Sequence, residues 1–242
     1  MVQRKAKLLA IPIQRINLKR KQTMANNTGG FGLRTVTTTG NTPATSGQSN
    51  YKIESGLDVG IFKNNPVSLN DGGATAGETG YLQDMSFDVT DDGGTGGVDF
   101  NNTNTALSVG VFNGAFFINN STSKPTFANS VAAGTTFGTD YNTGSSDGIG
   151  FVNDNPTQQY VVKCDAAVTQ AMIGTAFNVN DFTAGDAKDG QSTVTLDIGG
   201  TAAETKLFRI VRSADQPGDN DLSLVNANVV VAYNAASNLY LD

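Results

Sequence analysis

The sequence contains no histidine and no tryptophan, and Cys164 is its only cysteine. Zinc sites need converging cysteine and histidine ligands, and Ser-His or Cys-His catalysis needs a histidine. An internal disulfide would need a second cysteine. The three commonest routes to hydrolytic or metal chemistry are therefore closed or nearly closed to this chain. We predict that it is not an enzyme, that it has no catalytic residues, and that it holds no metal or other cofactor.

Charged residues make up only 16% of the 242 residues. No apolar run approaches the roughly 18 residues that a membrane helix needs, and no short apolar segment ends in a small-residue cleavage site. We therefore expect neither a membrane span nor a secretory signal. Glycine (28 residues), asparagine, threonine, aspartate and serine are abundant instead. Because these residues favour turns and polar strand faces over helix interiors, the composition predicts an all-β fold.

Charge is distributed unevenly along the chain. Residues 1–24 hold seven of the 16 basic residues and none of the 22 acidic ones, so the remainder carries about −13. Such an acidic body repels phosphate backbones, and we expect it not to bind nucleic acid. The basic segment is open to three interpretations. It could bind an acidic partner or nucleic acid, it could be an amphipathic transit-like segment, or Met24 could be the true beginning.

Strand-rich runs separated by Gly, Asp, Asn and Pro extend along most of the chain. They are residues 51–53, 59–62, 67–69, 159–168, 192–198, 206–213 and 227–234. Residues 106–118 indicate a hairpin or a bent strand that turns at Asn113-Gly114, a dipeptide that tight hairpin turns favour. Residues 169–179 are compatible with a short helix or an irregular crossing.

These runs predict an all-β protein with a β-barrel or β-sandwich body and an extended N-terminal arm. We expect residues 1–50 to form the basic extension and the arm. The body would then span residues 51–242, either as one unit or as two small subdomains, 51–150 and 151–242.

The second half of the expected arm, residues 25–50, is polar and rich in threonine and glycine. Such a segment cannot fold alone, but a strand added to a neighbouring surface would satisfy its backbone. Phe31, Leu33 and Val36 are the candidate apolar anchors, and Arg34 could pair with a carboxylate. We predict that these four residues bind a partner; the alternative is a disordered tail with an incidental phenylalanine.

Three other groups have ordinary structural interpretations. Cys164 shares one face of a predicted strand with apolar residues, which indicates a buried structural thiol. Asp91 and Asp92 lie beside glycines without the ligand spacing of calcium loops, which favours a solvated turn. Arg209 and Arg212 are expected to pair with acidic residues of the segment 215–221, and such surface pairs contribute little stability.

Several short motifs follow one another in a fixed order along the chain. They are "NNTGGFGLR" (26–34), "YKIESG" with "IFKNNPV" (51–67), "VGVFNGAFF" (109–117), "FVNDNP" with "YVVKCD" (151–165), and "LFRIVRSADQPGDND" with "NVVVAYN" (207–234). In this order the motifs resemble a family of capsid decoration or cement proteins of tailed bacteriophages, especially marine ones. Residues 1–23 lie outside the resemblance.

The resemblance implies a non-enzymatic structural protein on the capsid surface of the virion. It implies a homo-oligomer, such as a trimer, that stabilises the shell by bridging neighbouring major capsid protein subunits. A protein that binds only the assembled state lowers the free energy of that state. On this interpretation Phe31, Leu33, Arg34 and Val36 contact the capsid.

Two other classes of protein share parts of this pattern. A head-fibre or tail-associated module that binds a receptor or carbohydrate could use the loop 140–148, with Tyr141 as a stacking platform, although the lack of tryptophan weakens this interpretation. A bacterial surface-layer or adhesion module has a similar composition but would need an export signal.

Overall fold

The computed structural model describes most of the chain from residue 26 onward. The described residues are 26–40, 47–53, 55–69, 80–85, 108–204, 206–214 and 220–241. The basic segment 1–24 and the Asp91-Asp92 turn lie outside them. Strands account for 44% of the described residues and helices for 3%, which confirms the prediction of an all-β fold.

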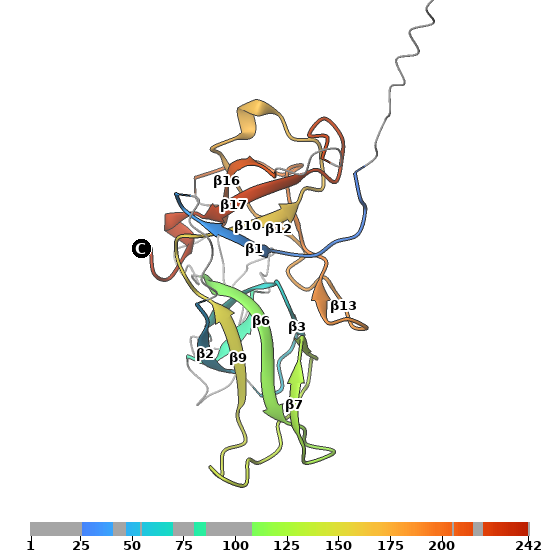
Figure 1. Ribbon diagram of the computed structural model, residues 1–242, viewed down its shortest axis with the longest axis vertical. Helices are drawn as coiled ribbons and strands as arrows, with labels where there is room; N and C mark the ends of the chain where they lie inside the picture. The colour runs from blue at the N-terminus through green and yellow to red at the C-terminus, as the bar shows by residue number, and fades with distance from the viewer. Residues whose placement is uncertain are drawn as a thin grey trace, which may run out of the picture.

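The first sheet has six strands in the order β4-β5-β2-β9-β6-β7, and an additional pairing of β4 with β6 closes five of them into a barrel. This barrel forms the lower half of the molecule in Figure 1. Its strands are β2 (Ser49–Ile53), β4 (Pro66–Leu69), β5 (Leu82–Asp84), β6 (Ser108–Ile118), β7 (Pro125–Ala128) and β9 (Gly148–Asn153). A short ribbon of β3 (Ile61–Phe62) and β8 (Ser130–Val131) accompanies them.

The strand β6 decides between the two structures expected for residues 106–118, a hairpin and a bent strand. A hairpin turning at Asn113-Gly114 does not form; β6 continues through this dipeptide as one strand of 11 residues. Its register with β9 shifts between Phe112 and Gly114, which marks a β-bulge, and Gly114 has a φ of 135°. The bent-strand alternative is therefore the right one. The reason is that β9 pairs with β6 on both sides of the bulge, so the chain has a partner to follow instead of folding back.

The second sheet has five strands in the order β1-β10-β17-β16-β11, all antiparallel. The strands are β1 (Arg34–Thr38), β10 (Gln158–Lys163), β11 (Ala176–Phe177), β16 (Phe208–Ser213) and β17 (Asn228–Tyr233). Short ribbons pair β12 (Val179–Asn180) with β15 (Thr195–Leu196) and β13 (Gly185–Asp186) with β14 (Gln191–Ser192). The crossing before β11 begins with a single 3-10 turn, η1 (Gln170–Met172).

Each sheet has its own hydrophobic core. The barrel encloses a cluster that includes Ile53, Phe112 and Val152, whereas one face of the second sheet packs against a larger cluster built around Tyr160 and Phe208. The first sheet therefore uses residues 49–153 and the second uses 158–233, together with β1 from the segment that precedes the barrel. Whether the two sheets belong to two subdomains, 51–150 and 151–242, stays a prediction.

The C-terminal segment joins the two sheets. After β17 the chain forms the 3-10 turn η2 (Ala235–Ser237), and the N–H of Leu239 then donates to the carbonyl oxygen of Ser108 at 3.0 Å. The buried Ser108 hydroxyl also donates to the hydroxyl of Tyr233 at 2.8 Å. These bonds connect the first residue of β6 with the end of β17, so the backbone after β17 has a fixed position on the barrel.

Candidate partner-binding surface

The predicted partner-binding residues lie on the second sheet of their own chain. Residues 26–33, called the strap from here on, lead directly into β1 (Figure 1). The register of β1 with β10 pairs Arg34 with Val161 and Thr35 with Tyr160. Within one chain, β1 therefore adds to the edge of the second sheet by pairing with β10.

The strap begins at Asn26, whose side chain bonds to the backbone of the turn 221–225. Asn26 is 6% exposed. Its amide nitrogen donates to the carbonyl oxygens of Asp221 at 2.9 Å and Val225 at 3.0 Å, and its amide oxygen accepts the N–H of Asp221 at 2.9 Å. Because the polar atoms of this side chain are satisfied by backbone groups of one turn, Asn26 fixes the start of the strap to residues 221–225.

A buried lysine holds the middle of the strap. Lys163, in β10, is 1% exposed, and its ammonium group donates to the backbone carbonyl oxygens of Asn27 and Gly29. The same nitrogen lies 5.9 Å from the centroid of the Phe31 ring. Among the described residues no carboxylate forms an ion pair with it. Burial without a counter-charge lowers the pKa of Lys163.

Two glycines let the strap lie close to the body. A Cβ atom at Gly30 would be 2.8 Å from the Cα atom and the carbonyl oxygen of Thr193. Gly32 has a φ of 64°, and a Cβ atom there would be 2.7 Å from the carbonyl oxygen of Asn64. Gly30 and Gly32 of the motif are therefore explained by close backbone approach and, at Gly32, by a left-handed conformation.

The four predicted residues have different environments. Leu33 is 0% exposed and belongs to the main core of the second sheet, so its side chain has no surface left for a partner. Phe31 and Val36 are half-buried against an outer cluster of Val161, Ala214 and Val230. Arg34 is exposed, with its guanidinium carbon 5.2 Å from the Phe31 ring centroid. Contact of Phe31, Arg34 and Val36 with a second protein stays a prediction.

Cys164 is a core residue, as expected. Its side chain is 0% exposed and it is a free thiol. Burial, with a smaller effect of the neighbouring Asp165, raises the pKa of the thiol to about 12. Since the thiolate is the reactive form, this environment makes Cys164 unreactive near neutral pH.

A thiol reagent should therefore label Cys164 slowly in the native protein and completely after unfolding. The measurement is the rate of labelling by an aromatic disulfide reagent at pH 8, with and without denaturant. Rapid stoichiometric labelling of the native protein would contradict the buried position.

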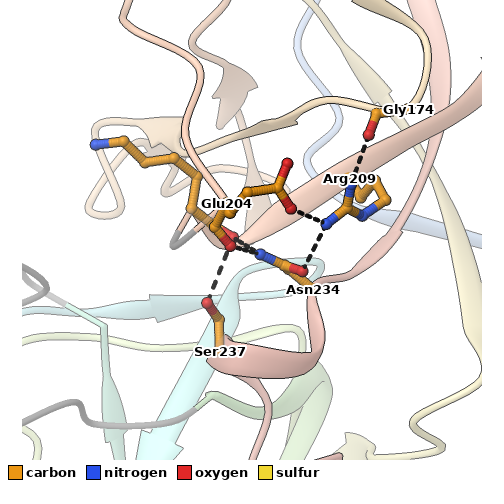
Figure 2. A network of polar contacts seen from close by, with 6 residues as sticks. Gly174, Glu204, Arg209, Asn234 and Ser237 are labelled. Atoms are coloured by element: carbon orange, nitrogen blue, oxygen red, sulfur yellow. Dashed lines mark hydrogen bonds and ion pairs between the residues drawn. The ribbon is translucent and has the colours of Figure 1, made fainter.

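A second polar network fixes the end of β17 (Figure 2). The guanidinium of Arg209 donates to the Glu204 carboxylate and to the Gly174 carbonyl oxygen, each at 2.6 Å, and to the amide oxygen of Asn234 at 3.2 Å. The Asn234 amide nitrogen donates to the backbone carbonyl oxygens of Glu204 and, at 3.0 Å, Lys206. Arg209 thus pairs with Glu204, in the loop before β16. Residues 215–219 of the expected partner segment lie outside the described residues, so pairing with them stays a prediction.

Sequence reasoning missed the residues that hold the strap. The sequence patterns gave Lys163 no role, and Asn26 entered only as the first residue of the motif 26–34. The available signal was a lysine within the apolar run "YVVKC", since a lysine inside a buried strand needs polar partners. Which carbonyl groups would supply them depends on a segment more than a hundred residues away in the sequence.

The described residues contain no helix with the length and apolar character to cross a membrane. They also contain no group of three or more Cys, Asp or Glu side chains arranged to hold a metal ion. No family model matches the sequence, no curated protein matches it, and no solved structure matches it.

Proposed function

We propose that this chain is a non-enzymatic virion structural protein. It binds the outside of an assembled bacteriophage capsid and stabilises it by bridging major capsid protein subunits. The observation that carries the proposal is where the resembling motifs lie in the fold. They supply the strap and the strands β2, β6, β10, β16 and β17. The resemblance thus involves the framework of both sheets as well as individual loops.

The physical character of the fold supports the same function. The chain presents two sheets with separate buried cores, and its single thiol is packed inside one of them. A rigid β-body of this kind stabilises a shell by binding it, since any ligand of the assembled state shifts the assembly equilibrium toward that state. Many copies on one shell multiply the effect.

Arg34 is the residue of the arm best placed to contact the shell. It is exposed at the start of β1, and stacking on Phe31 limits the directions in which its side chain can extend. Phe31 and Val36 add partly exposed apolar surface on the same side. In this arrangement Leu33 acts from within the body by anchoring β1, and Arg34 pairs with a carboxylate of the capsid subunit.

Replacing Arg34 by glutamate should weaken binding to undecorated shells about tenfold or more, because it puts a negative charge opposite the proposed carboxylate. Occupancy is measured by co-sedimentation of the full-length protein with shells of the major capsid protein, together with the temperature at which the shells break down. Lys188→Glu, the same charge change at an exposed lysine outside the arm, is the matched control. Absence of wild-type binding would overturn the proposed function. Equal binding by both variants would place the contact elsewhere.

A receptor- or carbohydrate-binding module is the second candidate, and one observation favours it. Tyr141 is 86% exposed. Its loop is braced because Asp140 accepts the N–H of Asn142 at 2.8 Å and that of Gly144 at 2.7 Å. An exposed aromatic ring on a braced loop can stack on a sugar. In the co-sedimentation assay the proposed shell protein should bind equally well with Tyr141→Ala.

A further inference from the structure

Two tyrosine hydroxyls meet where the C-terminal segment lies against the barrel. Tyr51 belongs to β2 and Tyr240 follows η2, so the two residues are 189 positions apart in the sequence. Their hydroxyl oxygens are 2.6 Å apart. The Tyr51 hydroxyl also donates to the Asp154 carboxylate at 2.8 Å. Since a phenol has only one proton to donate, the Tyr240 hydroxyl is the donor in the bond between the two tyrosines.

The backbone holds both rings in place. Tyr51 is the third residue of β2, and β2 pairs with β9 along its whole length. On the other side, the N–H of Tyr240 donates to the side-chain oxygen of Asn238 at 3.0 Å, and Asn238 is 1% exposed. The N–H of the intervening Leu239 is bonded to Ser108, the first residue of β6. The fold therefore positions the two hydroxyls against each other.

An oxidant in solution has access to this pair. Tyr240 is 48% exposed and Tyr51 is half-buried. A second pair of tyrosines, Tyr160 and Tyr233, differs in both respects that matter: the residues are 0% and 5% exposed, and their rings meet edge to face. An oxidant that stays outside the protein therefore reaches Tyr240 but not the buried pair.

Asp154 supplies a proton acceptor for oxidation of Tyr51. A tyrosine that loses an electron must also lose its hydroxyl proton to become a neutral phenoxyl radical. Partial burial, and then the hydrogen bonds with Tyr240 and Asp154, raise the pKa of Tyr51, so this proton does not leave beforehand near neutral pH. The Asp154 carboxylate accepts a hydrogen bond from that proton and can take it as the electron departs.

We propose that Tyr51 and Tyr240 are the site of an oxidative cross-link, a dityrosine, formed by a one-electron oxidant such as a ruthenium(III) complex. One electron leaves each ring and reduces one equivalent of the oxidant. The Tyr51 proton goes to Asp154 and the Tyr240 proton to solvent. A carbon–carbon bond then forms between the two Cε atoms beside the hydroxyls. The hydrogens on these carbons are lost as protons while both oxygens regain theirs, so the net loss is two electrons and two protons.

The observed contact resembles the geometry of the product. In a dityrosine the two hydroxyls flank the new bond and lie within hydrogen-bonding distance of each other, as those of Tyr51 and Tyr240 do before any bond has formed. Reacting groups held in this way couple faster within one chain than between chains. The link would join the barrel to the segment that follows the second sheet, and links that close long loops constrain the unfolded chain most. The inference is independent of shell binding, and either proposal can fail without the other.

The test exposes dilute full-length protein to tris(bipyridine)ruthenium(III), generated by light and persulfate. Dityrosine fluorescence gives the yield, and mass spectrometry of the digested protein identifies the linked peptides. Wild-type protein should form the Tyr51–Tyr240 link at a rate that does not depend on protein concentration. Tyr51→Phe and Tyr240→Phe should each lose the linked peptide and reduce the initial fluorescence rate about tenfold or more. Tyr141→Phe, which removes a tyrosine that is 86% exposed, should keep the link and its rate.

Asp154→Asn tests the proton acceptor. The amide keeps an oxygen that accepts a hydrogen bond but is not basic, so the initial rate of linking should fall about tenfold or more. Circular dichroism and thermal unfolding check that all variants fold. Oxidised tyrosine without the Tyr51–Tyr240 peptide would overturn the proposal, and so would a link that forms equally fast in urea-unfolded protein. A wild-type rate in Asp154→Asn would overturn the role of Asp154.

Discussion

The Leu33→Ala variant should unfold with a free energy about 2–5 kcal/mol lower than that of the wild-type protein. Leu33 is 0% exposed and is part of the core cluster that contains Tyr160 and Phe208. Truncation would leave a cavity between the strap and the second sheet. The N–H of Leu33 also donates to the carbonyl oxygen of Asn64 at 2.9 Å, which limits how far the backbone can move to fill it.

Urea unfolding followed by circular dichroism measures this difference, with the slope checked for constancy between variants. Val36→Ala is the matched control, because it removes apolar atoms from a half-buried side chain in the same segment. Its expected cost is about 1 kcal/mol. If Leu33→Ala were no more destabilising than the control, the strap would not be seated on its own body. The arm would then be free to bind a neighbouring subunit, as the sequence alone suggests.

The Lys163→Met variant should release the strap while β1 stays paired. Methionine keeps most of the apolar stem but cannot donate to the carbonyl groups of Asn27 and Gly29. Hydrogen bonds to charged groups contribute about 1.5–3 kcal/mol. Amide exchange at Leu33 should therefore accelerate roughly ten- to hundredfold. Hydrogen exchange with mass spectrometry gives this rate, and Lys188→Met, at an exposed position, should leave it unchanged.

The Lys163→Met variant should also differ from the wild-type protein in how its free energy of unfolding depends on pH. Burial places the pKa of Lys163 in the folded protein below its ordinary value of 10.5, so the unfolded chain binds more protons between these two values. The contribution of Lys163 to the free energy of unfolding therefore rises with pH across that interval. Removing the titrating group in Lys163→Met should remove this rise. A wild-type protein that loses stability through Lys163 as pH rises would contradict the buried, unpaired ammonium.

Both predictions follow from the arm being bound to the second sheet of its own chain. From its composition the segment 25–50 has too few apolar residues to fold alone, and this remains true of its sequence. The structure satisfies the described part of it with backbone partners on β10, a glycine-rich approach to Thr193, and a lysine from the same sheet. The strand β1 therefore pairs with a surface of its own chain, and of the four predicted contact residues Phe31, Arg34 and Val36 retain exposure for a second protein.

The sequence by itself determined the fold class and most of the strands. Alternation at residues 51–53, 67–69 and 206–213 matched β2, β4 and β16 closely, because period-two patterning is a local property. The burial of Cys164 followed from the same local pattern. The short 3-10 turn at Gln170–Met172 agreed with one of the alternatives for its segment.

Only the tertiary structure decided how distant segments meet. Asn113-Gly114 has the local chemistry of a hairpin turn, yet the pairing of β6 with β9 on both sides of it makes a bulge. Lys163 reads as one residue of a strand until Asn27 and Gly29 supply its acceptors. Contacts of this kind depend on sequence separations of 134 and 136 residues, for which local propensity carries no information.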